Sequence, residues 1–376
     1  MLKRLTICLA IFSAGGLACA EGDGEFAEFL EQQQQAFASF EQGHHEEFEA
    51  FVKRWQEAEQ AYRAQVAKHW QDAELSGRTR LVQYSGNLNQ RTIVDYEENT
   101  VTVELAQDQS DAEVRETLAR ELNKLRRTTV AEAASQDPVL VNAGVSVRYK
   151  SGSQVGQRKL VPGLADAEFT ADAVTISRNQ GRVTAKVKVP DRNTLKLAEE
   201  FLPLAQENAR KWGIPPALIL AVAHTESSFN PLARSHIPAF GLMQIVPTSA
   251  GKDISQELYG SPRLLTPDYL YDPEKNIEAG SVYLYLLLNR YFRQVADTES
   301  RFYMAVSAYN TGPGNVARAM SNTTKLPAAT RVANQLKPEE VYRHLLQNLP
   351  AQETRNYLTK VTERYAFYQS HLESQL

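Results

Sequence analysis

The sequence predicts an α+β protein, with an N-terminal part built from helix and β-strand and a mainly α C-terminal part. Three observations carry this prediction: aromatic residues at helical spacing before residue 75, β-rich runs up to residue 190, and short apolar helices punctuated by Gly and Pro beyond it. A chain of 376 residues is longer than one ordinary domain. We therefore expect an accessory domain at 21–190 and a second domain at 191–376.

Residues 1–20 have the features of a secretory signal peptide. A basic start precedes an apolar run that is shorter than the ~20 residues a membrane span needs, and small residues follow up to Ala20. We therefore expect export to the periplasm. Cleavage after Ala20 would release a soluble protein, whereas a lipid on Cys19 would anchor it to the outer membrane. Gly16 makes the lipoprotein pattern marginal, because a larger apolar residue is usual there.

Composition excludes several classes of function. Lys and Arg number 41 against 45 Asp and Glu, a net charge of −4, which argues against nucleic acid as a partner. The two cysteines, Cys8 and Cys19, both lie in the signal region, so a mature chain would have no disulfide, thiolate metal site or cysteine nucleophile. His44, His45 and His69 have no spaced ligands around them. We therefore expect no metal site.

The accessory domain is expected to hold an amphipathic helical segment at 25–75 and an α+β part at 80–190. The aromatic stripe of the first segment is interpreted as facing a core, and Gly43 as a break in the helix. No catalytic group of residues stands out in this domain. Strands are expected at 92–96, 101–105, 145–149, 174–176 and 183–189, with a helix at 112–127.

The second domain contains one unusual helix with an acid at its end. Pro203 is expected to start a helix that Gly213 terminates, and a helix at 217–226 then follows, apolar all round and therefore buried. Glu226 ends this second helix, where the helix dipole and apolar neighbours disfavour a negative charge. A carboxyl group that stays protonated near neutral pH can act as a general acid.

Five short motifs occur in order over about 130 residues, at 226–231, 241–244, 276–280, 308–310 and 353–357. They begin with Glu-Ser-Ser-Phe-Asn-Pro and end with Glu-Thr-Arg-Asn-Tyr. Together they resemble the soluble-lytic-transglycosylase domain, and the whole chain is similar to the membrane-bound, C type of lytic murein transglycosylase. The resemblance implies a lysozyme-like catalytic domain. It also implies cleavage of peptidoglycan glycan strands between N-acetylmuramic acid and N-acetylglucosamine, with Glu226 as the catalytic residue and no cofactor.

The resemblance further implies a set of substrate-binding residues. Ser227 has a helix-capping alternative, and Met243 and Tyr283 have core-packing alternatives. Ser235 matches a serine near the catalytic carboxyl, whereas Ile237 replaces a second serine found in some relatives. Gln244 is expected to hold the N-acetyl group, and Tyr357 to point at the acid. The candidates are Ser227, Ser235, Met243, Gln244, Tyr283, Tyr309, Asn310 and Tyr357.

Two other functions stay open at this point. A lysozyme-type hydrolase would need a second carboxylate to activate water, and Asp253, Asp268, Asp272 and Glu274 are interpreted as solvated or capping groups instead. A catalytically silent peptidoglycan-binding scaffold would not need Glu226 and its partners, all of which are present.

Overall fold

The computed structural model describes residues 43, 46–145, 147, 157–165, 167–190, 192–235 and 239–374. It divides into two compact units, residues 1–47 and residues 48–376, and the account below concerns the second. The expected signal peptide, both cysteines, His44, His45, Ile237 and most of the strand expected at 145–149 lie outside the described residues.

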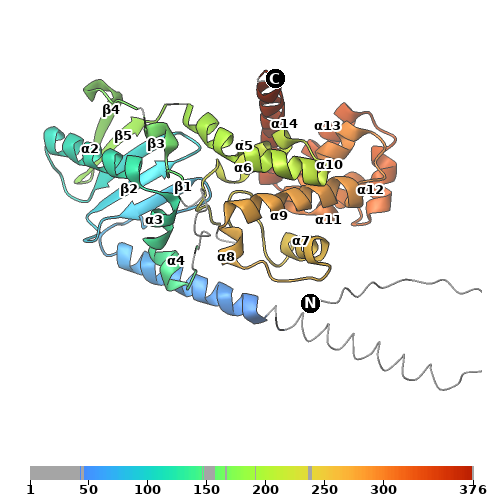
Figure 1. The fold of residues 1–376 in the computed structure, drawn as a ribbon, viewed down its shortest axis with the longest axis horizontal. Coiled ribbons are helices and arrows are strands. Elements are labelled where there is room, and N and C mark those ends of the chain that lie inside the picture. Colours follow the sequence, from blue (N-terminus) through green and yellow to red (C-terminus); the bar gives the residue numbers. More distant parts are fainter. Residues whose placement is uncertain are drawn as a thin grey trace, which may run out of the picture. The chain divides into compact units, whose positions relative to one another are not determined.

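The accessory part is built around one antiparallel sheet of five strands, in the order β1-β2-β3-β5-β4 (Figure 1). Along β5 buried Val183, Ala185 and Val187 alternate with more exposed residues, as expected for a strand with one face on a core. The helix α2 (Asp111–Arg127) packs on β3 and β5 and covers that face. The strands are β1 (Arg80–Tyr84), β2 (Gln90–Asp95), β3 (Thr100–Leu105), β4 (Val174–Asn179) and β5 (Arg182–Lys188).

The expected helix at 112–127 and the four strands that fall on described residues are confirmed, and β1 is an additional strand. Short elements complete the accessory part. They are α3 (Val130–Ser135), α4 (Pro138–Asn142), η1 (Pro162–Leu164) and η2 (Ala171–Ala173).

A helix at 46–66 carries the aromatic stripe expected from the sequence. Phe48, Phe51 and Trp55 are buried on it. The rings of Phe51 and Trp55 pack edge-on against Phe240 of the C-terminal part, with centroids 5.9 and 5.4 Å away. The stripe is therefore core-facing, as expected, and it joins the two parts of the unit.

Among the described residues after 192, the C-terminal part is built from helices and the loops that join them, with isolated β-bridges only at 234–245. Its first helix, α5, begins at Arg192 and not at Pro203, so that expectation was wrong. Pro203 lies inside α5, where Leu197, Phe201 and Ala205 are buried, and this packing offsets the cost of the proline, roughly 3 kcal/mol. Gly213 follows the end of α5 at a φ of 66°, as expected of a helix terminator.

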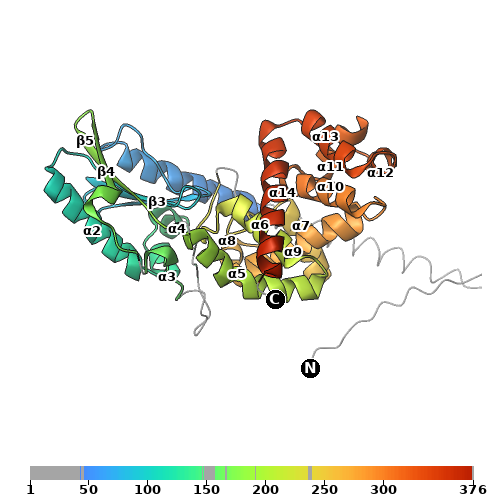
Figure 2. The same cartoon turned by 90° about the horizontal axis from the view of Figure 1, so that it is seen from above.

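The helix α6 (Pro216–Ser227) is apolar on every side and buried, and three other helices, α5, α9 and α14, pack on it. The long C-terminal helix α14 (Gln352–Glu373) lies alongside α6, and α5 (Arg192–Trp212) packs on it as well (Figure 2). The others are α7 (Ala250–Tyr259), α8 (Pro267–Leu270), α9 (Pro273–Leu286), η3 (Leu287–Tyr291), α10 (Thr298–Thr311), α11 (Pro313–Ser321), α12 (Leu326–Ala333) and α13 (Pro338–Asn348).

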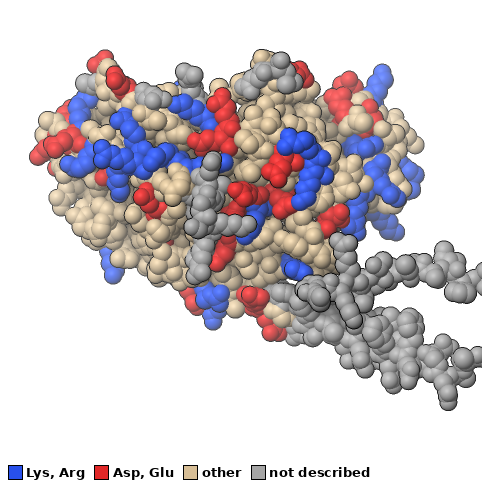
Figure 3. Space-filling view, in the orientation of Figure 1, with Lys and Arg blue, Asp and Glu red and all other residues tan. Residues whose placement is uncertain are grey.

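The expected α+β class, with a mainly α part at the C-terminal end, is confirmed. On the face drawn in Figure 3, acidic and basic side chains are interspersed, in agreement with the near-balanced composition. In the described part of the chain no helix is both long and apolar enough to cross a membrane.

Candidate active site

Glu226 lies in the last turn of α6 and is 6% exposed. Pro216 starts the helix, and Ser228 ends it in the left-handed conformation, so the acid is placed at the carboxyl end of a buried helix. Burial raises the pKa of Glu226 to about 7. The positive charge of Arg78 and the hydroxyl of Tyr357 lower this pKa, whereas the negative charge of Glu353 raises it. Glu226 can therefore exchange a proton near neutral pH.

Arg78 comes from the accessory part, just before β1, and contacts the end of α6. Its Nε donates to the main-chain oxygen of Glu226 at 3.0 Å, and its Nη2 donates to that of Thr225 at 3.3 Å. Nη2 also lies 3.4 Å from Oε2 of the Glu226 carboxyl. Nη1 donates to Oε1 of Glu353, at the start of α14, at 3.1 Å. A cation from the first half of the chain thus faces the acid.

Two tyrosines lie on the other sides of the acid. Tyr357 is 3% exposed, and its hydroxyl has no hydrogen-bond partner within 3.5 Å among the described residues. Its electrostatic interaction with Glu226 still places it close to the carboxyl. Tyr309, in α10, also interacts electrostatically with Glu226. Its hydroxyl donates to the main-chain oxygen of Met243 at 2.9 Å. The expectation that Tyr357 points at the acid agrees with this arrangement.

A cavity of about 350 Å³ opens next to Tyr309. It brings together four of the candidate residues, from two helices, α9 and α10, and the loop before α7: Gln244, Tyr283, Tyr309 and Asn310. The rings of Tyr283 and Tyr309 lie 5.4 Å apart, and the Asn310 side chain accepts a hydrogen bond from Thr354 at 2.8 Å. Amide and hydroxyl groups beside aromatic rings suit a sugar ligand, which offers both apolar faces and hydroxyls.

The loop at 240–244 holds Gln244 in place. Gly241 has a φ of 76°, and a Cβ there would lie 2.3 Å from the main-chain oxygen of Leu270, so only glycine fits. The buried Asn276 side chain donates to the main-chain oxygens of Phe240 and Leu270 and accepts from the Met243 amide. Gln244 Nε2 donates to Gly241, while its Oε1 is buried with no partner among the described residues. A buried acceptor left without a partner beside a cavity is a candidate for ligand binding.

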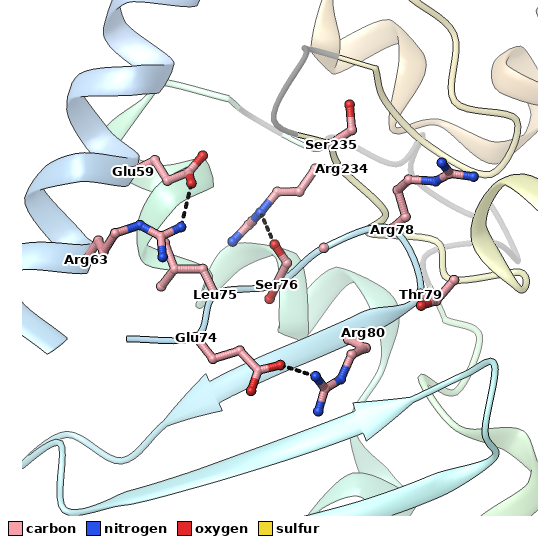
Figure 4. A pocket seen from close by; sticks show the side chains of 11 residues that line it. Glu59, Arg63, Glu74, Leu75, Ser76, Arg78, Thr79, Arg80, Arg234 and Ser235 are labelled. Carbon is pink, nitrogen blue, oxygen red and sulfur yellow. Dashed lines mark hydrogen bonds and ion pairs between the residues drawn. The ribbon is translucent and has the colours of Figure 1, made fainter. Parts of the chain in front are cut away.

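A second cavity, of about 290 Å³, lies on the Arg78 side (Figure 4). Ser235 lines it, together with Arg78, rather than the cavity of Gln244. In Figure 4 the Arg78 side chain points away from Arg234 and Arg80. The other lining residues are Glu59, Arg63, Glu74, Leu75, Ser76, Gly77, Thr79, Arg80 and Arg234.

Two candidates are part of the core and not of a cavity wall. Ser227 is fully buried, and its hydroxyl lies 3.1 and 2.8 Å from the main-chain oxygens of Ala223 and Leu242, so it supports the helix end. Met243 is fully buried, and its side chain packs so closely on Gly280 that a Cβ there would lie 2.2 Å from the sulfur. For both residues the structure favours the alternative role given above over substrate contact.

Sequence reasoning missed Arg78 and Asp253. Arg78 is 148 positions from Glu226 and belongs to no motif, so no local signal points to it. Asp253, interpreted above as solvated or capping, lines the 350 Å³ cavity and accepts a hydrogen bond from the Tyr291 hydroxyl at 2.7 Å. Asp253 is the fourth residue of α7, and the loop-like composition around it did not predict this helix. Asp272, in contrast, caps α9 as interpreted.

The described residues contain no cluster of three or more His, Cys, Asp or Glu side chains that could hold a metal ion. What the site offers is one buried carboxyl group with a pKa near 7, a cation beside it, and a polar, aromatic cavity. These features are typical of an enzyme that uses general acid and base catalysis, and the cavity suits a carbohydrate.

Comparisons with known proteins specify the family. The model described as "Transglycosylase SLT domain" matches residues 203–332. Membrane-bound lytic murein transglycosylase C of Cronobacter sakazakii is 31% identical over 313 residues, which cover 78% of this chain and 83% of the relative. The protein of the same name from Actinobacillus succinogenes is 42% identical over 171 residues, about half of either chain (46% and 47%). The chain therefore belongs to the lytic murein transglycosylases and is an enzyme of that family.

Solved structures of lytic transglycosylases also match, at a lower level of overall similarity. The 70 kDa soluble lytic transglycosylase SLT70 from Escherichia coli is 26% identical, with a TM-score of 0.34, over 45% of this chain and 24% of that one. The lytic transglycosylase Slt from Pseudomonas aeruginosa is 20% identical, with a TM-score of 0.37, over 68% and 37%.

Proposed function

We propose that this chain cleaves the β-1,4 bond between N-acetylmuramic acid and N-acetylglucosamine in peptidoglycan and leaves a 1,6-anhydromuramic acid end. The observation that carries the proposal is the state of Glu226: buried, at a helix carboxyl end, with a pKa of about 7. Such a group is partly protonated at neutral pH and can serve first as an acid and then as a base.

The steps balance without water or a cofactor. Glu226 donates its proton to the glycosidic oxygen, and the bond from that oxygen to C1 of the muramic acid breaks. The 2-acetamido oxygen of the same sugar stabilises the positive charge at C1, which replaces the second carboxylate that most glycosidases use. The Glu226 carboxylate then removes the proton from the C6 hydroxyl, and O6 bonds to C1. The acid is thereby restored.

The 350 Å³ cavity supplies groups that suit this substrate. The unpartnered Oε1 of Gln244 is assigned to the N–H of an acetamido group, which is the role expected from the sequence. Tyr283 and Tyr309 offer an aromatic wall, and Asn310 a polar edge. Tyr357, whose hydroxyl lowers the pKa of Glu226, is assigned to the catalytic carboxyl.

One observation favours the second candidate function, a lysozyme-type hydrolase. Asp253 places a carboxylate in the same cavity, and a hydrolase needs such a group to activate water. The hydroxyl of Tyr291 donates a hydrogen bond to Oδ2 of Asp253 at 2.7 Å. This contact favours a supporting role for Asp253 over that of a base. We therefore rank transglycosylation first.

Mass analysis of the fragments released from purified sacculi tests the proposal. An anhydro end is lighter by one water than a hydrolysed reducing end, so the two reactions are separated in one spectrum. Anhydro ends are expected, and reducing ends from the wild-type enzyme would establish the hydrolase. Binding to sacculi without release of any fragment would leave the silent scaffold as the function.

We also propose that the chain is exported and acts in the periplasm, in keeping with residues 1–20 and with the names of its membrane-bound relatives. Metabolic labelling with a radioactive fatty acid decides how it is held there. Label in the wild type that is lost in Cys19→Ala, together with release from the membrane fraction, would establish an outer-membrane lipoprotein. No label in either form would establish a soluble periplasmic enzyme.

A further inference from the structure

The backbone at Arg78 is attached to the loop that follows α6. The Asn230 side chain, which is fully buried, donates to the main-chain oxygen of Arg78 at 3.1 Å. The amide of Arg234 lies 3.4 Å from the main-chain oxygen of Gly77. These contacts fix the position of a residue that lies in the accessory part, outside the segment matched by the family model. Arg78 is therefore not a freely moving surface arginine.

All three nitrogens of the Arg78 guanidinium group make hydrogen bonds, two of them at the end of α6 and one to α14. Two of them reach the main-chain oxygens of Thr225 and Glu226, which have no partners within the helix because they lie in its last turn. A cation at a helix carboxyl end is also favoured by the helix dipole. The third nitrogen donates to the Glu353 carboxylate. This contact orients the guanidinium group toward α14.

A second accessory residue holds the same turn from another side. Glu97, in the turn between β2 and β3, accepts hydrogen bonds from the Ser228 hydroxyl and from Arg364 and Lys360 of α14. Arg364 in turn donates to the main-chain oxygen of His224 at 2.9 Å. The last turn of α6 is thus fixed by accessory residues at two places, and of these two residues it is Arg78 that reaches the carboxyl of Glu226 itself.

We propose that Arg78 is a positioning residue for the reaction: it orients the Glu226 carboxyl and stabilises its carboxylate form, so that the accessory part completes the active site. This rests on the function proposed above. Between the two proton transfers a bare carboxylate stands in a buried site at a helix carboxyl end, where both burial and the dipole oppose it. A positive charge 3.4 Å from Oε2 offsets that cost at the moment when the second proton must be accepted.

The pH dependence of activity separates this role from a purely structural one. The charged and titratable groups that face Glu226 are Arg78 from the accessory part, Glu353 and Tyr357 from α14, and Tyr309 from α10. Arg78 is the positively charged group among these four residues. Its removal should raise the pKa of Glu226, and activity that depends on the protonated acid should then persist to higher pH.

The experiment is a pH profile of muropeptide release by Arg78→Met, which keeps the length of the side chain and removes its charge. The alkaline limb should move up by about one pH unit, the low end of the effect of an opposite charge. The kcat should fall by roughly 10- to 100-fold through lost orientation, with little change in KM. Arg178→Met is the matched control, because Arg178 lies in β4 and forms ion pairs with Asp108 and Asp111. It should leave both the limb and the kcat unchanged.

An alkaline limb and a kcat that match the wild type in a folded Arg78→Met would overturn the proposal. Circular dichroism melts report whether the variant folds. If it does not, Arg78→Lys keeps the charge but loses the fork, and it should show a limb near that of the wild type with a reduced kcat. A wild-type kcat in Arg78→Lys would then show that the guanidinium group is not needed to orient the Glu226 carboxyl. Anhydro ends from the wild type, measured in parallel, keep a failure of this proposal distinct from a failure of the proposed function.

Discussion

Arg234, in the loop after α6, forms an ion pair with Asp137, at the start of α4, with Nη1 2.8 Å from Oδ2 and both side chains 6% exposed. Asp137 also caps α4 by accepting from the amides of Val139 and Leu140, and Arg234 lies over the ring of Trp55. The pair therefore connects three segments of the unit: the helix at 46–66, α4 and the loop that leads from the catalytic helix to the Gly241 turn.

This pair predicts a large effect on stability. Arg234→Met should lower the free energy of unfolding by about 3–5 kcal/mol, because it leaves the Asp137 charge buried without its partner. The double variant Arg234→Met/Asp137→Asn should recover a large part of that loss, since neither charge is then buried alone. Urea titrations of the two variants check this. Equal losses in both would show that the cost comes from lost packing and not from an uncompensated charge.

Much of the catalytic part could be predicted from the sequence, because its signals are local. The apolar run at 217–226 places Glu226 at a helix end, and the resemblance of the motifs at 241–244 and 308–310 to those of the family predicts Gln244 and Asn310 as binding residues, which line one cavity. The start of α5 was predicted wrongly at Pro203. The packing of the apolar face of this helix offsets the cost of a proline in its interior. The division at residue 190 stays a prediction.

The contact between Arg78 and Glu226 could not be predicted, for a physical reason. It joins residues 148 positions apart through a segment with no regular pattern, and it depends on Asn230 and Arg234 holding the backbone of 77–78. The role of Met243 was ambiguous for a different reason. A methionine beside a glutamine fits a cavity wall or a core equally well, and the choice is made by Gly280 of α9, which leaves room for the sulfur.

Glu226→Gln should abolish fragment release while leaving the fold intact, because the amide has the same shape but cannot deliver a proton. The expected loss is roughly 10²- to 10⁴-fold or more in kcat. Turnover of purified sacculi checks this, with sacculus binding as the control for a folded cleft. Retention of more than about a tenth of the wild-type rate would remove Glu226 from the mechanism.

The same substitution should change how stability depends on pH. The folded pKa of Glu226, about 7, is above the ordinary value of 4.5 for a glutamic acid, so the stabilising preference for the protonated form is fully present below pH 4.5. It is lost as the pH rises through 7, because the unfolded chain then ionises more readily than the folded one. Glu226→Gln should therefore gain stability relative to the wild type between pH 4.5 and 7. Denaturant midpoints that differ by a constant amount over this range would contradict the raised pKa.

Asp253→Asn distinguishes the two reactions that the cavity permits. In a transglycosylase the carboxylate is not a base, so the released ends should stay anhydro, with the rate reduced only as far as the Tyr291 contact matters. In a hydrolase the loss of this carboxylate should cost roughly 10²-fold or more. The mass spectrum and the rate are read from the same digest. A collapse of the rate, with reducing ends in the residual product, would assign Asp253 as a base.

The last prediction concerns Tyr357, which lies in the first half of α14 with its hydroxyl buried and unpartnered among the described residues. Interaction with this hydroxyl lowers the pKa of Glu226, while burial raises it by more, so the net value is about 7. Tyr357→Phe keeps the buried ring and removes only the hydroxyl that acts on Glu226. It should raise the pKa of Glu226 further.

The alkaline limb of the activity profile of Tyr357→Phe should consequently move up in pH, while kcat falls through lost orientation of the carboxyl. Tyr368→Phe is the matched control on the same helix, since the Tyr368 hydroxyl pairs with Nδ1 of His224 at 3.0 Å and not with the acid. His224, two positions before Glu226, lies on another side of α6 and stacks on Phe229. Loss of the Tyr368 hydroxyl should therefore not move the alkaline limb of the activity profile. A limb that stays in place in Tyr357→Phe, or one that moves equally in Tyr368→Phe, would show that Tyr357 does not act on Glu226.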